Sequence, residues 1–159
     1  MKLLDFLLTE ATIDDLAARE KAEGVKEMVA KLVEVEALEK KQLKPVTEAV
    51  MARESLGSTG IGKGVAVPHA KHRAVTKVTG LVALSRSGVE FAAIDGELVH
   101  LLFLVVSPPD KPAEHLQALE RIAVLLRDEN LSKFLKRARN REEVAELLAE
   151  ADQKFGDRS

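Results

Sequence analysis

The sequence predicts an α/β layered domain in which helices cover a central apolar sheet. The residues from Leu101 to Val106 form an uninterrupted apolar run of strand length, which indicates a strand buried on both faces. Amphipathic helical repeats come before and after this run, and β-branched residues are frequent between residues 75 and 85. Helices on either side of a set of apolar strands are typical of a layered α/β domain.

The length and composition indicate one independently folding domain. The 159 residues suit a single domain, which we expect to span residues 1–152, followed by a polar tail at residues 153–159. The chain has no cysteine, which excludes disulfides, thiolate zinc sites and thiol catalysis. A formal net charge of -2 and an aromatic content of 3% argue against a nucleic-acid partner. No apolar run is long enough to cross a membrane and the first residues make a poor signal peptide, so we expect a cytoplasmic protein without direct membrane insertion.

The first third of the chain is predicted to be mainly helical. In residues 3–17 the pattern favours a helical turn at Ile13–Leu16, capped by Thr12, over a short strand. Apolar residues at helical spacing predict an amphipathic helix over residues 24–38. A second helix is expected over residues 45–54, where Pro45 stands near the start and its missing N–H is harmless.

The middle of the chain alternates between turns and predicted strands. A loop with four glycines occupies residues 55–64, and Pro68 is expected to end the short strand that follows it. The predicted strands, in order, are residues 65–67, 75–85, 89–91 and 99–106, with a turn at Asp95-Gly96 before the last of them.

The last third is predicted to be helical. Three prolines between residues 108 and 112 interrupt the chain, and a helix is expected from Ala113 to Asp128. Ser132 is expected to cap a short helix that ends near Arg137, and Asn140 to cap another that ends near Ala151.

The glycine loop resembles a nucleotide-binding P-loop only in part. Gly57 and Gly62-Lys63 have the required spacing, but Gly64 stands where a Ser or Thr should bind magnesium. A strand follows the loop, whereas a P-loop is followed by a helix. A turn-rich surface loop without a ligand is the stronger alternative to a nucleotide site.

Among the four histidines, His69 has the most informative surroundings. His69 and His72 lack the spacing and the glutamate of a zinc-binding helix, so no metal is expected, and His100 fits a hydrogen-bonded structural residue. His69 follows a proline that ends a strand, and the glycine loop just ahead of it offers backbone N–H groups to an anion. A neutral imidazole is a competent nucleophile, so this combination suggests a phosphoryl acceptor.

A long stretch around His69 resembles a known family. The stretch is Arg53-Glu54-Ser55-Leu56-Gly57-Ser58-Thr59-Gly60-Ile61-Gly62-Lys63-Gly64-Val65-Ala66-Val67-Pro68-His69-Ala70-Lys71, with further matches at residues 91–96, 101–104 and 115–119. It is similar to the active-site signature of enzyme IIA domains of the fructose–mannitol class in the phosphoenolpyruvate-dependent sugar phosphotransferase system, which the nitrogen-regulatory branch shares. The resemblance implies the enzyme IIA type 2 fold, a mixed β-sheet flanked by helices on both faces. It also implies a short strand near Ile13–Leu16, which we adopt in place of the helical turn.

The resemblance further implies the residues of the site. His69 would be the phosphorylated histidine, through Nε2, with Arg53 and His115 beside it. The Arg53 guanidinium would bind phosphoryl oxygens, and His115 would stabilise charge from the start of its helix. Thr59 matches a hydroxyl position of the loop, and with Gly60, Gly62 and Gly64 it makes up the expected phosphate-binding loop. No bound cofactor and no metal are implied.

The expected function is a phosphoryl relay, which makes the protein a phosphotransferase component. His69 would accept the phosphoryl group from a histidine phosphocarrier protein and donate it to a IIB-type component. The alternative is a nitrogen-type regulatory protein that binds target proteins according to the phosphorylation state of His69. A third possibility is a module that binds small anions without turnover.

Residues near His69 are candidates for partner docking. Leu56, Ile61 and Val65 would offer apolar surface, although core packing explains Val65 equally well. Lys63, Lys71 and Arg73 would supply electrostatic complementarity, or are ordinary solvated charges.

Overall fold

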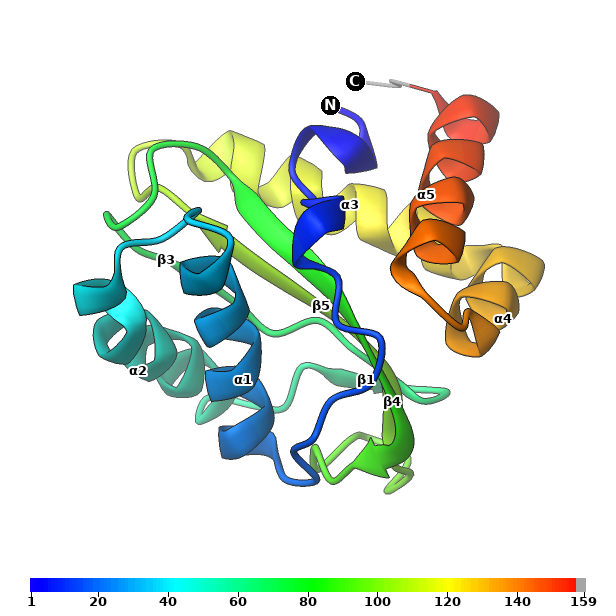
Figure 1. The fold of residues 1–159 in the computed structure, drawn as a ribbon, viewed down its shortest axis with the longest axis horizontal. Helices are drawn as coiled ribbons and strands as arrows, with labels where there is room; N and C mark the ends of the chain where they lie inside the picture. Colours follow the sequence, from blue (N-terminus) through cyan, green and yellow to red (C-terminus); the bar gives the residue numbers. More distant parts are fainter. Residues whose placement is uncertain (157–159) are drawn as a thin grey trace.

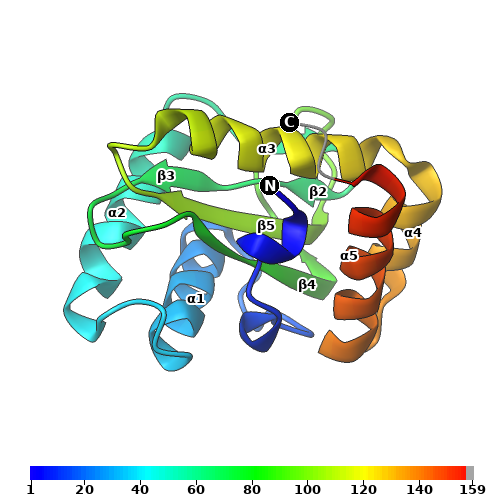
Figure 2. The same ribbon diagram turned by 90° about the horizontal axis from the view of Figure 1, so that it is seen from above.

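The computed structural model describes residues 1–156 and has the predicted layered architecture, with one mixed sheet between two layers of helices (Figures 1 and 2). One face carries helices α1 (Lys21–Glu34) and α2 (Leu43–Glu54). The other face carries α3 (Pro112–Arg127), α4 (Glu129–Arg137) and α5 (Arg141–Phe155). Short 3₁₀ turns occupy Leu3–Asp5, Thr9–Ala11 and Lys40–Gln42.

The sheet is organised around strand β5. Its five strands are β1 (Gly60–Gly62), β2 (Val65–Ala66), β3 (His69–Lys71), β4 (Thr79–Val89) and β5 (Val99–Ser107). On one side β5 pairs with the antiparallel strand β4; on the other it pairs in parallel first with β2 and then with β3. The strands β2 and β3 therefore lie end to end along β5, and β3 is an edge strand.

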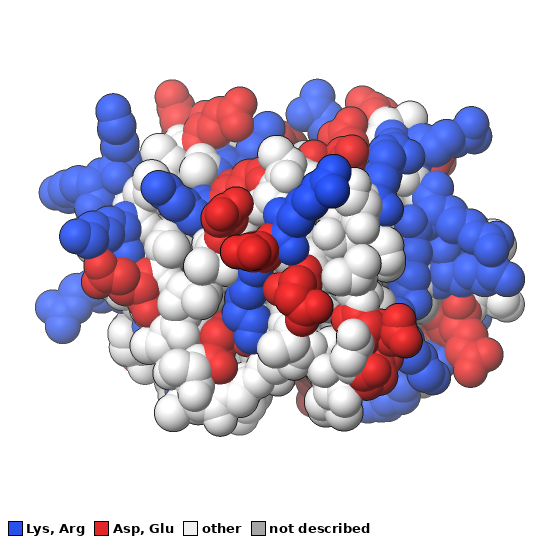
Figure 3. All heavy atoms as spheres, turned by 90° about the horizontal axis from the view of Figure 1, so that it is seen from below, with Lys and Arg blue, Asp and Glu red and all other residues white. Residues whose placement is uncertain are grey.

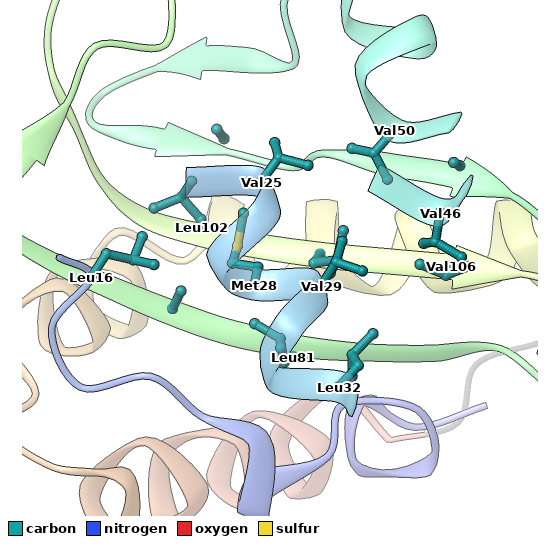
Figure 4. Packing of buried hydrophobic residues seen from close by; sticks show 14 of the residues in the cluster. Leu16, Val25, Met28, Val29, Leu32, Val46, Val50, Leu81, Leu102 and Val106 are labelled. Carbon is teal, nitrogen blue, oxygen red and sulfur yellow. The ribbon is translucent and has the colours of Figure 1, made fainter. Parts of the chain in front are cut away.

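Strand β5 is buried on both faces, as the apolar run from Leu101 to Val106 predicts. Val99, Leu102, Leu104 and Val106 belong to the cluster beneath α1 and α2, in which Figure 4 shows Leu102 beside Met28 of α1. Leu101, Phe103 and Val105 belong to the cluster beneath α3, α4 and α5. Because both helical layers cover the strand, an alternation of polar and apolar residues is absent from its sequence.

The predicted helices of the first half exist with shifted ends. α1 begins at Lys21 and ends at Glu34, four residues before the predicted end, and Glu36 then adopts a positive φ of 64°. α2 begins at Leu43, so Pro45 lies within its first turn, where the backbone N–H has no helical partner to lose.

The strands differ from the prediction in two places. The regions 75–85 and 89–91 were expected to be separate strands, but β4 runs from Thr79 to Val89 with a pairing irregularity between Leu84 and Val89. Within this irregularity the Gly88 N–H donates to Ser85 Oγ at 2.9 Å and Gly88 has a φ of 92°. β2 ends at Ala66, ahead of Pro68 as predicted, but β3, a strand that was not predicted, follows directly. The Pro68 carbonyl oxygen accepts a hydrogen bond from the N–H of Val105 at 3.1 Å, and pairing with β5 resumes at His69.

The segment around Ile13 is extended, so the helical turn that the residue pattern favours there is wrong. Ile13 forms an isolated parallel bridge with Ala83, and its N–H donates to the carbonyl oxygen of Val82 at 3.0 Å. The strand implied by the resemblance is therefore present as this single bridged residue, Ile13. Pairing against β4 overrides the weak local preference, since Ile13 packs against the core.

The helices of the last third also correct the prediction in detail. Asp128 caps α4, accepting the Leu131 N–H at 3.0 Å, whereas the predicted cap Ser132 lies buried within the helix. Asn140 caps α5 as predicted, accepting the Glu143 N–H at 2.9 Å. α5 continues to Phe155, so the predicted polar tail begins later than residue 153; residues 157–159 of that tail lie outside the described residues. Within residues 1–156, no helix combines the length and the apolar character needed to cross a membrane.

Candidate functional site

His69 lies at the start of the edge strand β3, opposite Val105 of β5. Its Nδ1 atom is 2.7 Å from the carbonyl oxygen of Val67. Because a carbonyl oxygen only accepts, the ring proton belongs on Nδ1, which donates this bond. Nε2 is left unprotonated, with a lone pair available for a bond to phosphorus.

The surroundings of His69 favour its neutral form. Burial is the largest effect and lowers the pKa of His69 below its usual value of 6.5. The hydrogen bond to Val67 opposes this shift, the positive charge of Arg53 adds to it, and the negative charge of Glu54 opposes it. The imidazole is therefore uncharged at neutral pH, as a nucleophile must be.

His115 lies beside His69, in the first turn of α3. The two ring centroids are 5.5 Å apart with the planes inclined at 53°, and His115 is 4% exposed. Its Nδ1 atom is 2.6 Å from the hydroxyl oxygen of Ser107, which fixes the ring against the end of β5. Burial, followed by the neighbouring charges of His69 and Lys71, lowers the pKa of His115 to about 4. This ring is also neutral at physiological pH.

Arg53 supplies the positive charge of the site from the last turn of α2. Its Nη1 donates to the carbonyl oxygen of Gly57 at 3.0 Å, which holds the guanidinium at the start of the glycine loop. A guanidinium has five N–H donors, so others remain available to an anion. The fold thus brings together Arg53, His69 and His115, the three residues that the sequence singled out, from α2, β3 and α3.

Glu54 is a component of the site to which sequence reasoning gave no role. This carboxylate is 5% exposed, forms an ion pair with Lys21 Nζ at 3.0 Å, and accepts hydrogen bonds from the backbone N–H and the hydroxyl of Thr59. An acidic residue beside Arg53 is visible in the sequence. Its partner Lys21 is distant in the sequence and carries no local signal.

A chain of hydrogen bonds connects this ion pair to the imidazole. Glu54 holds Thr59, whose carbonyl oxygen accepts the N–H of Val67 at 3.0 Å. The carbonyl oxygen of Val67 in turn accepts from Nδ1 of His69. The ion pair between α1 and α2 therefore supports the carbonyl group that selects the tautomer of His69.

The glycine loop forms a hairpin, and its hydrogen bonds account for several of its residues. The Thr59 hydroxyl is bound to Glu54, and the Gly60 N–H donates to Ser58 Oγ at 3.0 Å. A Cβ atom on Gly60 would lie 2.9 Å from Cβ of Ala93, so only glycine fits there. Gly62 and Gly64, with φ values of 93° and 75°, make the turn between β1 and β2. Their expected role in binding phosphate stays a prediction.

The other two histidines have structural partners. His72 Nδ1 accepts the Ala74 N–H at 3.0 Å, and His100 Nδ1 donates to the carbonyl oxygen of Ser85 at 2.8 Å, in keeping with the structural role expected for His100. Across the described residues 1–156, no group of three or more His, Cys, Asp or Glu side chains is placed to hold a metal ion.

The geometry around His69 defines the class of site, and the sequence shows the family to which the chain belongs. A neutral histidine with a free Nε2, beside a guanidinium and a second neutral histidine, is suited to holding a phosphoryl group. The chain belongs to the EIIA 2 family of the phosphoenolpyruvate-dependent sugar phosphotransferase system, which matches residues 5–151. This family is a phosphotransfer component of that system.

Individual relatives and solved structures agree with this assignment. A nitrogen regulatory protein of Bradyrhizobium diazoefficiens is 36% identical over 149 residues, covering 94% of this chain and 95% of the relative. The crystal structure of IIA-Ntr from Neisseria meningitidis has a TM-score of 0.81 at 32% identity, covering 91% of this chain and 97% of that one. The IIA mannitol chain from Escherichia coli, solved in complex with phosphorylated IIB mannitol, has a TM-score of 0.74 at 25% identity and coverages of 90% and 96%.

Proposed function

We propose that the protein carries a phosphoryl group on Nε2 of His69, accepted from the phosphohistidine of a histidine phosphocarrier protein. The observation that carries this proposal is the hydrogen bond from His69 Nδ1 to Val67, which leaves Nε2 as the only nucleophilic atom of the ring. Family membership supports the same role.

The transfer step exchanges one nitrogen–phosphorus bond for another. The Nε2 lone pair of His69 attacks phosphorus in line, and the bond to the donor imidazole breaks with its electron pair returning to that ring. The Nδ1 proton of His69 stays on Nδ1, hydrogen-bonded to Val67. Charge on the equatorial oxygens is stabilised by the Arg53 guanidinium and by His115 at the start of α3.

The next acceptor in this proposal is a IIB-type component. The support is the Escherichia coli relative, a IIA mannitol chain seen in complex with phosphorylated IIB mannitol. His69 of this chain would pass its phosphoryl group to such a domain by the reverse of the step above.

The alternative function is regulation through binding of target proteins. It is favoured by the nitrogen regulatory protein of Bradyrhizobium diazoefficiens, which aligns with this chain over 95% of its length. A phosphoryl group adds about two negative charges beside Arg53, which changes what the surrounding surface can bind.

Exposed apolar side chains on the elements of the site supply a docking surface in either case. Leu56 is 83% exposed after α2, Ile61 is 53% exposed in β1, and Leu116 is 66% exposed next to His115. Val65, by contrast, is 3% exposed and belongs to the core, so it is not part of the docking surface. Lys71 and Arg73, both exposed near β3, remain proposed sources of charge complementarity.

Phosphoryl labelling tests the relay. Incubation with labelled phosphoenolpyruvate, enzyme I and the phosphocarrier should label the protein in an acid-labile, alkali-stable manner. His69→Ala should abolish the label, and the matched control His72→Ala should keep it. Absence of label while a known acceptor is labelled would contradict both the relay and the phosphorylation switch, and would leave simple anion binding.

A second measurement separates the two functions. Labelled protein is mixed with an isolated IIB domain, and transfer of the label favours the relay. Retention of the label, together with target proteins that bind only one phosphorylation state, favours regulation.

A further inference from the structure

A groove lined by cations lies between the β1–β2 turn and helices α3 and α4. Its volume is about 520 Å³, and its cationic side chains are Lys63 of the turn and Lys133, Lys136 and Arg137 of α4. The only carboxylate among the described residues that line it is Glu129. We call these four cations and the space between them the cationic groove.

The cationic groove is a strong local excess of positive charge on a chain whose net charge is -2. In the part of the chain that the structure describes, none of its four cations forms an ion pair. Figure 3 shows Lys and Arg side chains gathered on the side of the molecule where Figure 1 places α4. Lys136 is half-buried, and burial together with the charge of Lys63 lowers its pKa. The groove thus holds four cations against the one carboxylate of Glu129, an excess of positive charge that a bound anionic group would offset.

The groove continues into an apolar hollow toward β2. This hollow, of about 450 Å³, shares Lys63, Leu126 and Glu129 with the cationic groove and adds the aliphatic Ile61 and Val65 together with Arg127. Ile61 is 53% exposed, whereas Val65 forms part of the buried wall. The complete surface therefore offers cations along one part and aliphatic side chains along the other.

We propose that the cationic groove binds an acidic segment of a partner protein, a segment in which a run of carboxylates is next to a run of apolar side chains. The uncompensated cations select carboxylates, and the adjoining hollow accepts aliphatic side chains. None of the described residues that line the two hollows is aromatic, so the surface lacks the stacking platform on which single-stranded nucleic acids depend.

This surface lies apart from the reacting atoms. Val65 and His69 pair with Leu101 and Val105 on the same side of β5, so they are separated by about 13 Å along the edge. A segment bound in the groove strengthens binding of its partner protein without contacting the imidazole of His69. The hollow shares Ile61 with the docking surface proposed above, but binding of the acidic segment does not require phosphorylation at His69.

Fluorescence anisotropy with a labelled peptide in which a run of glutamates is followed by leucines tests the proposal. The protein should bind the peptide at low salt, and its affinity for the peptide should fall as salt is added. The exposed pair Lys133→Glu and Arg137→Glu should weaken binding about tenfold or more. The matched control is Lys40→Glu with Lys41→Glu, an exposed pair on the first helical face that changes the net charge equally.

The outcomes are distinct. Selective loss of binding in the α4 variant supports the groove, provided that circular dichroism shows an unchanged fold. Equal weakening in both variants shows attraction by net charge alone and overturns the proposal, as does an absence of binding at low salt. A single-stranded oligonucleotide that binds the same α4 residues more tightly than the peptide would also overturn it and assign the groove to nucleic acid.

Discussion

At the scale of single residues, the central feature is a carbonyl group that decides the chemistry of an imidazole. The carbonyl oxygen of Val67 accepts a hydrogen bond from Nδ1–H of His69, and burial lowers the pKa of His69. The sequence identified His69 and, through its resemblance, Arg53 and His115. It gave no indication of Lys21 or Ser107, because a contact between distant residues leaves no trace in local spacing.

The tautomer of His69 is a direct prediction at this scale. Nitrogen NMR of the unphosphorylated protein should show a protonated Nδ1 and an unprotonated Nε2 at neutral pH, because only Nδ1 faces an acceptor. The midpoint of its titration should lie below 6.5. A protonated Nε2 would contradict the assigned nucleophile.

The ion pair beneath the loop gives a second prediction. Glu54→Gln leaves Lys21 without its carboxylate and weakens the bonds to Thr59, so unfolding free energy should fall by about 1–3 kcal/mol. The tautomer preference of His69 should weaken as well, since Thr59 holds Val67. Glu48→Gln, on the exposed face of α2, is the control. An unchanged nitrogen spectrum in the Glu54 variant would confine that residue to a structural role.

The low pKa of His115 predicts a pH dependence of stability. The folded-state value of about 4 lies below the usual 6.5, so between these values the unfolded chain binds more protons. The contribution of His115 to the free energy of unfolding should be complete above pH 6.5. It should fall as the pH drops toward 4, by at most about 1.4 kcal/mol per pH unit for this one proton. Urea titrations of the wild type and of His115→Gln should show a shallower slope in the variant. Equal slopes would mean that His115 is not held neutral by the fold.

At the scale of elements, amphipathic periodicity predicts helices better than local propensity predicts strands. The buried stripe of α1 contains Val25, Met28, Val29 and Leu32, as the spacing indicates. The strand β3, in contrast, has no signal of its own, since its pairing partner Val105 lies far along the chain and Pro68 precedes it. The bridge at Ile13 likewise depends on the presence of β4.

The cap of α4 provides a prediction at this scale. Asp128→Ala should lower unfolding free energy by about 1 kcal/mol, whereas Ser132→Ala should lack this capping effect. Asp128 also forms an ion pair with Lys154 at 2.6 Å, so the measurement should be repeated with Lys154→Met as the background. If Asp128→Ala no longer lowers the unfolding free energy in the Lys154→Met background, the effect comes from the ion pair and not from the cap.

At the scale of the whole molecule, a buried core holds the candidate site at the edge of its sheet. The two hydrophobic clusters meet at β5, and the three site residues project from elements that pack on or pair with that strand. The layered fold was predictable because a strand buried on both faces requires helices on both sides. The register of β2 and β3 against β5, which sets the positions of the site residues, was not predictable from local pattern.

The separation between core and docking surface can be measured. Leu104→Ala removes a fully buried side chain of β5 and should lower unfolding free energy by about 2–5 kcal/mol. Leu116→Ala, at a position that is 66% exposed, should change it by less than about 0.5 kcal/mol and instead slow phosphoryl transfer from the carrier. A large stability loss in the Leu116 variant would remove that residue from the docking surface.

The most direct test of the account is NMR of the phosphorylated protein, in which coupling between phosphorus and a labelled ring nitrogen identifies the bonded atom. We expect a single coupled nitrogen, Nε2 of His69, with the proton retained on Nδ1. Phosphorus bonded to Nδ1 of His69, or to any other histidine, would contradict it.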